Sequence, residues 1–449
     1  MRKSAVADIA TEALIGKLRQ RIVRDVGLLA SDEPTLAVLS ALALSCFWSD
    51  YIIPEGPEES VYISNILDRL NSHAPPCTLG VEAHLLGLAC YRPLSELGVA
   101  DGILGEASGP FLDSLLLESI HNPRQEEKIK SGIIKLTELE GGVSKRVKEQ
   151  YEKSPYPRWR VNKIKQRRAL PAAHILSNIG CANGLNEYTL EGAPKILVAG
   201  CGTGQHALAV HSRFIHSGVD AFDLCETSLA YAIRKTNELQ IEDLSYYQAD
   251  INLIGGWAKR FDLIECCGVL HHLASPINGW RNLEALLNPG GLMKIALYSS
   301  RARQGFNDSR HETSRFIENL DLNKMKSLRY DIIKSEVDPS LSYKDVQAEA
   351  KNVARQHPIT SLDFYNTNEV RDLLFHEQEH QFDLPEIQQS LGALNLKFLG
   401  MEVNHPIRNS FVSSFGKKAL HSLEAWHDFE LSYPDTFRGM YQMWFQKHQ

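Results

Sequence analysis

A short apolar segment that runs into a turn with three glycines constrains the fold of this chain more than any other feature. The segment reads ILVAGCGTGQH over residues 196–206. Its apolar residues favour a strand, while glycine permits a positive φ and lets another group approach the main chain closely. If a helix follows, its first N–H groups are unbonded and can face an anion. The segment therefore predicts a strand, a turn and a helix of the kind that binds nucleotide-like ligands in α/β sheets.

From residue 195 onward, short apolar segments alternate with helical stretches, which predicts a parallel sheet with helices on both faces. We expect strands at residues 195–199, 219–223, 244–248, 261–266 and 292–298, with helices between them, for example at 228–238 and 276–287. A polar helical stretch follows at about 301–390, then a returning strand at 396–403 and one or two docked helices at 420–445. The expected fold class is α/β, a Rossmann-like, doubly wound, mostly parallel sheet with a helical insertion after strand five.

The first 140 residues repeat apolar side chains at helical spacing, most clearly at residues 9–26, 36–48 and 61–70. The longest apolar run is too short to cross a membrane, and no apolar region typical of a signal peptide follows the N-terminus. No repeat of fixed period is visible. We expect a helical N-terminal domain at 1–143, a basic linker and aromatic lid segment at 144–193, and the α/β domain at 194–449.

Charge is distributed unevenly along the chain. The formal net charge is −7, which argues against a general nucleic-acid binder. Residues 144–168 nevertheless hold ten Lys and Arg against two Glu, so the rest of the chain carries −15. The eight cysteines form no C-x-x-C pair, which favours reduced thiols over a zinc ribbon or a redox motif. We expect a cytoplasmic protein without a membrane partner; a homo-oligomer formed through the N-terminal domain is compatible with the sequence.

Two features indicate which class of ligand the glycine turn binds. Gln205 stands where the dinucleotide pattern G-x-G-x-x-G has its third glycine, which disfavours a nicotinamide oxidoreductase. Asp223 ends the second expected strand, where an acid can accept hydrogen bonds from both ribose hydroxyls. Because aspartate also caps helices, Asp223 alone is weak evidence for a ribose contact, and the glycine turn nineteen residues earlier strengthens it. Glu226 is a nearby alternative for the same contact.

The G-x-G-x-G turn resembles motif I of class I S-adenosylmethionine (SAM)-dependent methyltransferases. The segments YYQAD at 246–250, GVLHHL at 268–273 and LNPGGL at 287–292 are similar to the family's segments after strand three, after strand four and before strand five. A finer resemblance joins the chain to a bacterial group of these enzymes, often fused to tetratricopeptide repeats, although no such repeat is visible here. It is carried by QYEKSPYPRW at 150–159, DLLFH at 372–376 with Glu379 and His380, and PDTFRGMY at 434–441.

The resemblance implies SAM as the cofactor and nominates the residues that bind it. The expected cofactor contacts are Gly200, Cys201, Gly202, Thr203, Gly204, Gln205, Asp223, Leu224, Asp250, Ile251, Cys267 and Val269. For Asp250, the alternative is a solvent-facing loop acid. Cys267 carries no motif of a nucleophile and is expected only to line the pocket.

His271 and His272 are the expected catalytic residues, because a nucleophile that starts protonated needs a base and imidazole suits that task near neutral pH. The alternative is that one histidine packs under the cofactor and the other caps a helix. Substrate or lid contacts are expected from Tyr151, Tyr156, Arg158, Trp159, His376 and His380. Aromatic rings can bind a sulfonium or ammonium cation, but the same aromatic segment could equally be a staple between domains.

Residues 376–380 read HEQEH and match the zinc-protease pattern H-E-x-x-H. On a helix these histidines would lie one turn apart, but a third ligand with a known spacing is missing from the sequence. We expect no metal site. The predicted function is SAM-dependent methyl transfer to a small-molecule, peptide or protein acceptor; the alternatives are a non-catalytic SAM-binding partner module and, less favoured, an NAD(P)-dependent oxidoreductase.

Overall fold

The protein is represented by a computed structural model. It describes residues 8–29, 32–72, 79–96, 99, 104, 109–138, 142–153, 159, 193–214, 217–307, 320–353, 357–376 and 378–449. Tyr156 and Arg158 of the expected lid lie outside the described residues. The chain divides into two compact units. Unit 1 comprises Met1–Gln125 and Gly305–His376, and unit 2 comprises Glu126–Gln304 and Glu377–Gln449.

Unit 1 is helical, as the apolar spacing of the N-terminal region predicts. Its first segment contains α1 (Ile9–Leu29), α2 (Glu33–Trp48), α3 (Pro57–Ser72), α4 (Leu79–Leu88), η1 (Leu94–Glu96), α6 (Asp113–Leu116) and η2 (Leu117–His121), and α7 (Asn122–Lys130) leads into unit 2. Its second segment contains α14 (Leu322–Glu336), α15 (Tyr343–Ala350), η6 (Pro358–Thr360), η7 (Leu362–Tyr365) and α16 (Thr367–Phe375). The two segments share one apolar core.

A buried ion pair joins the two segments of unit 1. Glu12 on α1 accepts hydrogen bonds from two nitrogens of Arg329 on α14, at 2.8 and 2.5 Å. Both side chains are almost fully buried. Because two charges withdrawn from water are tolerated only when paired and hydrogen-bonded, this contact fixes how α14 packs against α1.

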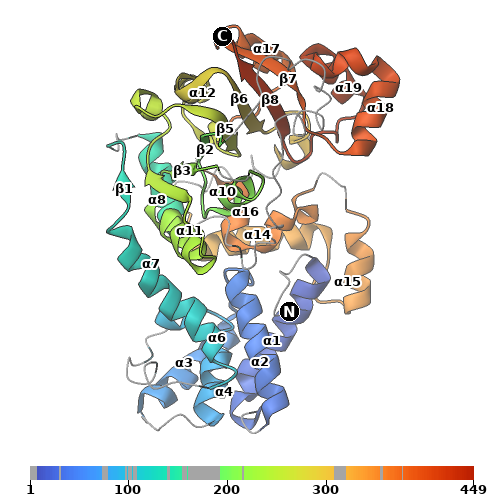
Figure 1. Cartoon of the computed structure of the whole chain (residues 1–449). Coiled ribbons are helices and arrows are strands. Elements are labelled where there is room, and N and C mark those ends of the chain that lie inside the picture. Colours follow the sequence, from blue (N-terminus) through green and yellow to red (C-terminus); the bar gives the residue numbers. More distant parts are fainter. Residues whose placement is uncertain are drawn as a thin grey trace. The chain divides into compact units, whose positions relative to one another are not determined.

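Unit 2 is built on an eight-stranded sheet (Figure 1) with the order β1-β4-β3-β2-β5-β6-β8-β7. The strands are β1 (Ile134–Lys135), β2 (Ile196–Ala199), β3 (Val219–Asp223), β4 (Leu244–Gln248), β5 (Phe261–Cys267), β6 (Leu287–Leu297), β7 (Leu396–Met401) and β8 (Tyr441–Lys447). The strands β1 to β6 pair in parallel, whereas β8 runs antiparallel to both of its neighbours. The strand order reverses between β2 and β5, which is where such sheets bind ligands at the carboxyl ends of their strands.

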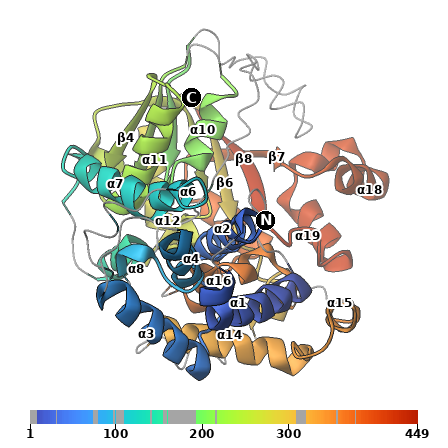
Figure 2. The ribbon, with the colours of Figure 1, turned by 90° about the horizontal axis from the view of Figure 1, so that it is seen from below.

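Helices cover both faces of this sheet, which confirms the doubly wound α/β fold. On one face lie α10 (Gln205–His211) and α11 (Glu226–Glu238), which are neighbours in Figure 2. Their apolar side chains share a core with Ile196, Val198 and Ala221. On the other face lie α12 (Pro276–Leu286), α17 (Leu384–Leu391), α18 (His405–Phe415) and α19 (Leu423–Ser432). Successive side chains of β2 alternate between the two cores, as the two-residue period of a strand requires.

The remaining elements include α8 (Val143–Lys153), η3 (Ile254–Gly256), η4 (Leu270–His272) and η8 (Lys417–His421). The described part of the basic segment therefore begins as a helix. The expectation of helices alone at 420–445 is wrong, since α19 is followed by the strand β8. None of the helices in the described ranges has the length and apolarity that a membrane crossing requires.

Candidate functional site

The turn after β2 has the backbone that the three glycines predict. Gly200, Gly202 and Gly204 have φ values of 68°, 52° and 83°, in the region that side chains rarely adopt. A Cβ on Gly200 would also stand 2.4 Å from a methyl group of Val269, which follows β5. This position therefore requires glycine both for its backbone angle and for the close approach of Val269.

Asp223 ties this turn to the end of β3. One carboxylate oxygen accepts a hydrogen bond from the backbone N–H of Gly202 at 2.8 Å, and the other accepts one from Cys225 at 2.9 Å. Burial raises the pKa of Asp223, although these backbone N–H groups act in the opposite direction. The carboxylate thus holds the glycine turn against the neighbouring strand.

Several of the expected cofactor residues meet at the carboxyl ends of β2, β3 and β5, which are adjacent in the sheet. The half-buried members of this group are Gly200, Gly202, Asp223, Leu224, Cys267 and Val269. Cys201 and Thr203 are instead buried beneath the turn, and Gln205 is exposed at the start of α10. The group at the strand ends therefore offers main-chain and carboxylate contacts to a ligand.

Asp250 follows β4 and lies in a tight turn. Its Oδ1 accepts a hydrogen bond from the backbone N–H of Asn252 at 2.8 Å, and its own N–H donates to Thr137 Oγ1 at 2.8 Å. Asp250 and Ile251 are both buried, each with 4% of its surface exposed. Asp250 is therefore held in a structured turn, in contrast to the alternative of a solvent-facing loop acid.

The helix α8 contacts the start of α11, directly after Asp223. Glu152 on α8 accepts hydrogen bonds from the backbone N–H of Glu226 at 2.7 Å and from the hydroxyl of Thr227. Lys148 donates to Glu226 at 2.7 Å. Tyr151, an expected lid residue, is half-buried on the same helix. This contact of Glu152 with α11 could not be predicted from the sequence, because the two positions are 74 residues apart along the chain.

Trp159 packs in the core on the α10 and α11 face of the sheet, with 7% of its surface exposed. Its indole N–H donates to the carbonyl oxygen of Thr203 at 2.9 Å, and its ring meets Tyr231 edge-on at 6.0 Å between centroids. This geometry fits a staple that braces the glycine turn from below.

His271 and His272 lie in η4, after β5. His271 is fully buried, and its ring lies 4.2 Å from that of Tyr298, between centroids. The guanidinium of Arg303 covers the same tyrosine ring, and Arg303 pairs with the buried Glu379 at 3.0 Å. The burial of His271 favours the alternative in which this histidine packs within the site.

His272 has a defined tautomer. Its Nδ1 lies 2.8 Å from the carbonyl oxygen of Gln378, and a carbonyl oxygen only accepts, so Nδ1 carries the hydrogen. In the uncharged ring, Nε2 is then the atom that can accept a proton. The expected lid residue His380 is nearby in the fold, because its backbone N–H donates to the carbonyl of His271 at 2.7 Å.

The segment HEQEH does not form the zinc-protease helix. The helix α16 ends at Phe375, and His376 has an extended backbone. The described residues after it, Gln378 to His380, are not helical either. In the described part of this segment, His376 and His380 therefore do not lie one turn apart on a helix, as the motif requires.

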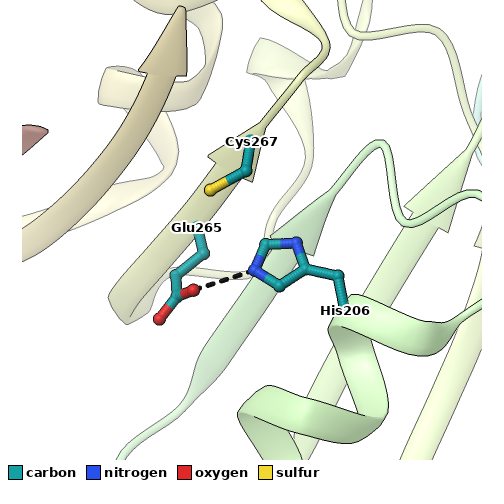
Figure 3. A group of neighbouring side chains, drawn as sticks. All are labelled: His206, Glu265 and Cys267. Atoms are coloured by element: carbon teal, nitrogen blue, oxygen red, sulfur yellow. Dashed lines mark hydrogen bonds and ion pairs between the residues drawn. The ribbon is translucent and has the colours of Figure 1, made fainter. Parts of the chain in front are cut away.

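A further cluster on β5 and α10 contains two residues that were not among the expected site residues. His206 on α10 and Glu265 on β5 are hydrogen-bonded at 2.9 Å, and Cys267 lies beside them (Figure 3). Arg213 pairs with the second oxygen of Glu265. Burial lowers the pKa of His206, but Cys267 and Glu265 outweigh it and raise the value to about 9. The pKa of Glu265 is held well below its ordinary value: burial raises it, and the attraction of Arg213 and His206 overcomes that effect.

Comparison with known proteins agrees with this geometry. Residues 196–291 match the family model described as a methyltransferase domain. The chain is therefore similar to this family over residues 196–291. S-adenosylmethionine is the cofactor that this similarity supports.

The methyltransferase domain is shared with relatives over a limited part of their length. An uncharacterised protein of Synechococcus sp. is 33% identical over 25% of this chain and 27% of its own length. The ubiquinone biosynthesis O-methyltransferase of Coxiella burnetii is 32% identical over 26% of this chain and 49% of its own length. The structure of PKMT2 from Rickettsia typhi in complex with AdoHcy is similar at 19% identity, covering 61% of this chain and 52% of that chain, with a TM-score of 0.44. The matches thus span about half or less of the curated relatives.

Proposed function

We propose that this protein transfers a methyl group from SAM to a nucleophilic atom of a small metabolite or of a peptide or protein side chain. The observation that carries the proposal is the convergence of the glycine turn and Asp223 at the reversal of the strand order. When bound, SAM supplies a methyl group bonded to a positive sulfur, so the protein's tasks are to place the acceptor and exclude water.

The cofactor-binding role in this proposal belongs to the residues at the strand ends. The main chain at Gly200 and Gly202 approaches the ligand without side chains, and Asp223 accepts hydrogen bonds from ribose hydroxyls. Asp250 and Ile251 flank the adenine. The hydrogen bond between Glu152 and Glu226 holds α8 against the start of α11. In this position α8, with Tyr151, forms part of the wall of the binding site near the ribose.

His272 is the proton acceptor in the proposal. Its Nδ1 lies 2.8 Å from the backbone carbonyl of Gln378, which orients the imidazole ring for this role. His271 supports this arrangement, since its buried ring packs on Tyr298 and its carbonyl holds the backbone of His380.

The free cysteines of the described residues fit the cytoplasmic location that the sequence favours.

Binding and turnover test the proposal separately. Calorimetry with S-adenosylhomocysteine (AdoHcy) should show binding to one site, and NAD should not compete with it. Labelled SAM should then transfer its methyl group to either the low-mass or the protein fraction of a cell extract. Absence of AdoHcy binding would refute cofactor binding. Binding without transfer to either fraction would instead support the non-catalytic SAM-binding module.

A further inference from the structure

The side chains of His206, Glu265 and Cys267 converge above β5, as Figure 3 shows. One nitrogen, one carboxylate oxygen and one sulfur all lie within 4.8 Å of one another. Glu265 and Cys267 are two residues apart on β5 and so point to the same face of the sheet, where α10 brings His206 over them. The cysteine is free and half-buried.

We propose that His206, Glu265 and Cys267 form a binding site for a thiophilic divalent cation, with Zn²⁺ as the ion that suits it best. An imidazole nitrogen, a thiolate and a carboxylate are the three ligand types that Zn²⁺ takes in proteins. Hard cations such as Mg²⁺ prefer oxygen ligands alone, so the thiol and imidazole discriminate against them. Cys267 also belongs to the group of residues at the strand ends, but cation binding does not depend on methyl transfer.

The geometry requires only small side-chain movements. Zinc bonds of about 2.0 Å to nitrogen and oxygen and about 2.3 Å to sulfur place tetrahedral ligand atoms about 3.3–3.5 Å apart. His206 Nε2 and Glu265 Oε2 are now 2.9 Å apart, so the ion would replace the hydrogen between them and part them slightly. The Cys267 sulfur lies within 4.8 Å of both atoms, so it has to move closer by at most about 1.3 Å.

The surrounding charges are compatible with such an ion. The thiolate and carboxylate together balance the two positive charges of the cation. Arg213 bonds the other oxygen of Glu265, which is the kind of outer contact that orients a ligating carboxylate. Lys294 on β6 is the second cation that faces Glu265, and it is paired with Glu402 at 2.7 Å.

Three protein ligands leave one position of a tetrahedral site open. Structural zinc sites usually have four protein ligands, whereas sites with three hold a water or a substrate atom in the fourth position. Cys267 directly precedes Gly268 and Val269, and Val269 touches the glycine turn. A cation at this cluster would therefore stand at the edge of the group that we assign to the cofactor.

The test is zinc binding by the metal-free full chain, followed by competition with a chromophoric chelator. One equivalent of Zn²⁺ should bind. Replacement by Co²⁺ should give a thiolate-to-cobalt charge-transfer band and the visible absorption of a tetrahedral site. Cys267→Ser should remove the charge-transfer band, and both Cys267→Ser and His206→Asn should weaken zinc binding by at least about 100-fold.

Cys266→Ser is the matched control, because Cys266 is the adjacent cysteine and packs in the core on the opposite face of the sheet. It should retain both the zinc affinity and the cobalt spectrum. Circular dichroism of every variant shows whether the fold persists, and His206→Asn leaves all thiols in place if Cys267→Ser fails to fold. Absence of stoichiometric zinc binding would overturn the proposal, as would binding that survives both substitutions; the cluster would then be a hydrogen-bonded ion network only.

Discussion

The indole N–H of Trp159 donates a hydrogen bond to the carbonyl oxygen of Thr203, inside the glycine turn that follows β2. Thr203 is completely buried, so the bond is shielded from water. The tryptophan belongs to the aromatic segment that precedes the α/β domain in sequence. One residue of that segment therefore helps to set the position of the turn to which we assign the cofactor.

Trp159→Phe tests this link. The substitution keeps the aromatic ring but deletes the N–H donor, which should cost about 1 kcal/mol of stability and weaken AdoHcy binding several-fold. Calorimetry and urea unfolding measure the two effects. Trp257→Phe, at a half-buried tryptophan that packs on Tyr247, is the control and should leave the affinity unchanged. If Trp159→Phe and the wild type bind AdoHcy with equal affinity, the Trp159 hydrogen bond does not contribute to cofactor binding.

Gly200→Ala should weaken cofactor binding. The added Cβ would lie 2.4 Å from Val269 and would occupy a backbone with φ of 68°, so the turn must shift. We expect the affinity for AdoHcy to fall by at least about tenfold, which corresponds to about 1.4 kcal/mol. Gly218→Ala, where a Cβ meets nothing within 4 Å, should bind normally. Normal binding by both variants would show that the turn is not the site.

Asp223→Asn should weaken AdoHcy binding by about 10–100-fold, since hydrogen bonds to a charged group contribute about 1.5–3 kcal/mol. The amide also replaces one acceptor of the backbone N–H bonds from Gly202 and Cys225 by a donor. Asp220→Asn, on the same strand, breaks only the partly exposed pair with Lys259 and serves as the control. A loss of affinity in both variants alike would point to a general disturbance of β3.

The pair of Arg303 and Glu379 should be important for stability. Both side chains are 5% exposed or less, so Glu379→Ala leaves a buried guanidinium without this partner and should cost about 3–5 kcal/mol. Urea unfolding of the single variants and of a double variant with Arg303→Met measures the coupling. If the double variant is as unstable as the sum of the two single variants, the pair contributes no coupling.

Glu369 should make the stability of unit 1 depend on pH. Burial, together with Asp363, Asp50 and Asp372, raises its pKa from 4.5 to about 8. The folded state thus binds the proton more tightly, so this stabilisation is complete below about pH 4.5 and is lost as the pH rises through about 8. At about 1.4 kcal/mol per pH unit, the loss is at most about 5 kcal/mol.

Glu369→Gln removes this titration and should be more stable than the wild type at about pH 9, with the advantage shrinking toward about pH 5. Urea unfolding at the two pH values measures the difference. The exposed Glu58, replaced by glutamine, provides the control in the same unit. An equal difference between Glu369→Gln and the wild type at both pH values would contradict the raised pKa.

The sheet could be predicted where local patterns are strong. The glycine turn, Asp223 and the strands β2 to β5 follow from short apolar runs between polar or glycine-containing turns. The strand β8 was missed because Tyr441, Met443, Trp444 and Phe445 are buried on both faces of the sheet, so the two-residue alternation disappears. An aromatic-rich segment without that alternation resembles a helix.

Contacts between distant positions could not be predicted from the sequence. His206 and Glu265 are 59 residues apart, and the residue pattern around either one does not predict that their side chains meet. His206 stands inside the glycine-turn motif, where its proximity to β5 depends on how α10 packs. The same limit applies to the contact that Glu152 of α8 makes with the start of α11 and to the contact of Trp159 with Thr203.

The buried pair of Glu12 and Arg329 has a consequence for synthesis of the protein. The two segments of unit 1 are separated by the 179 residues from Glu126 to Gln304. At about 5–20 residues per second, a ribosome needs about 10–40 s to add them. Throughout that interval the apolar side of α1 lacks its later partner, which makes the nascent chain a client for chaperones.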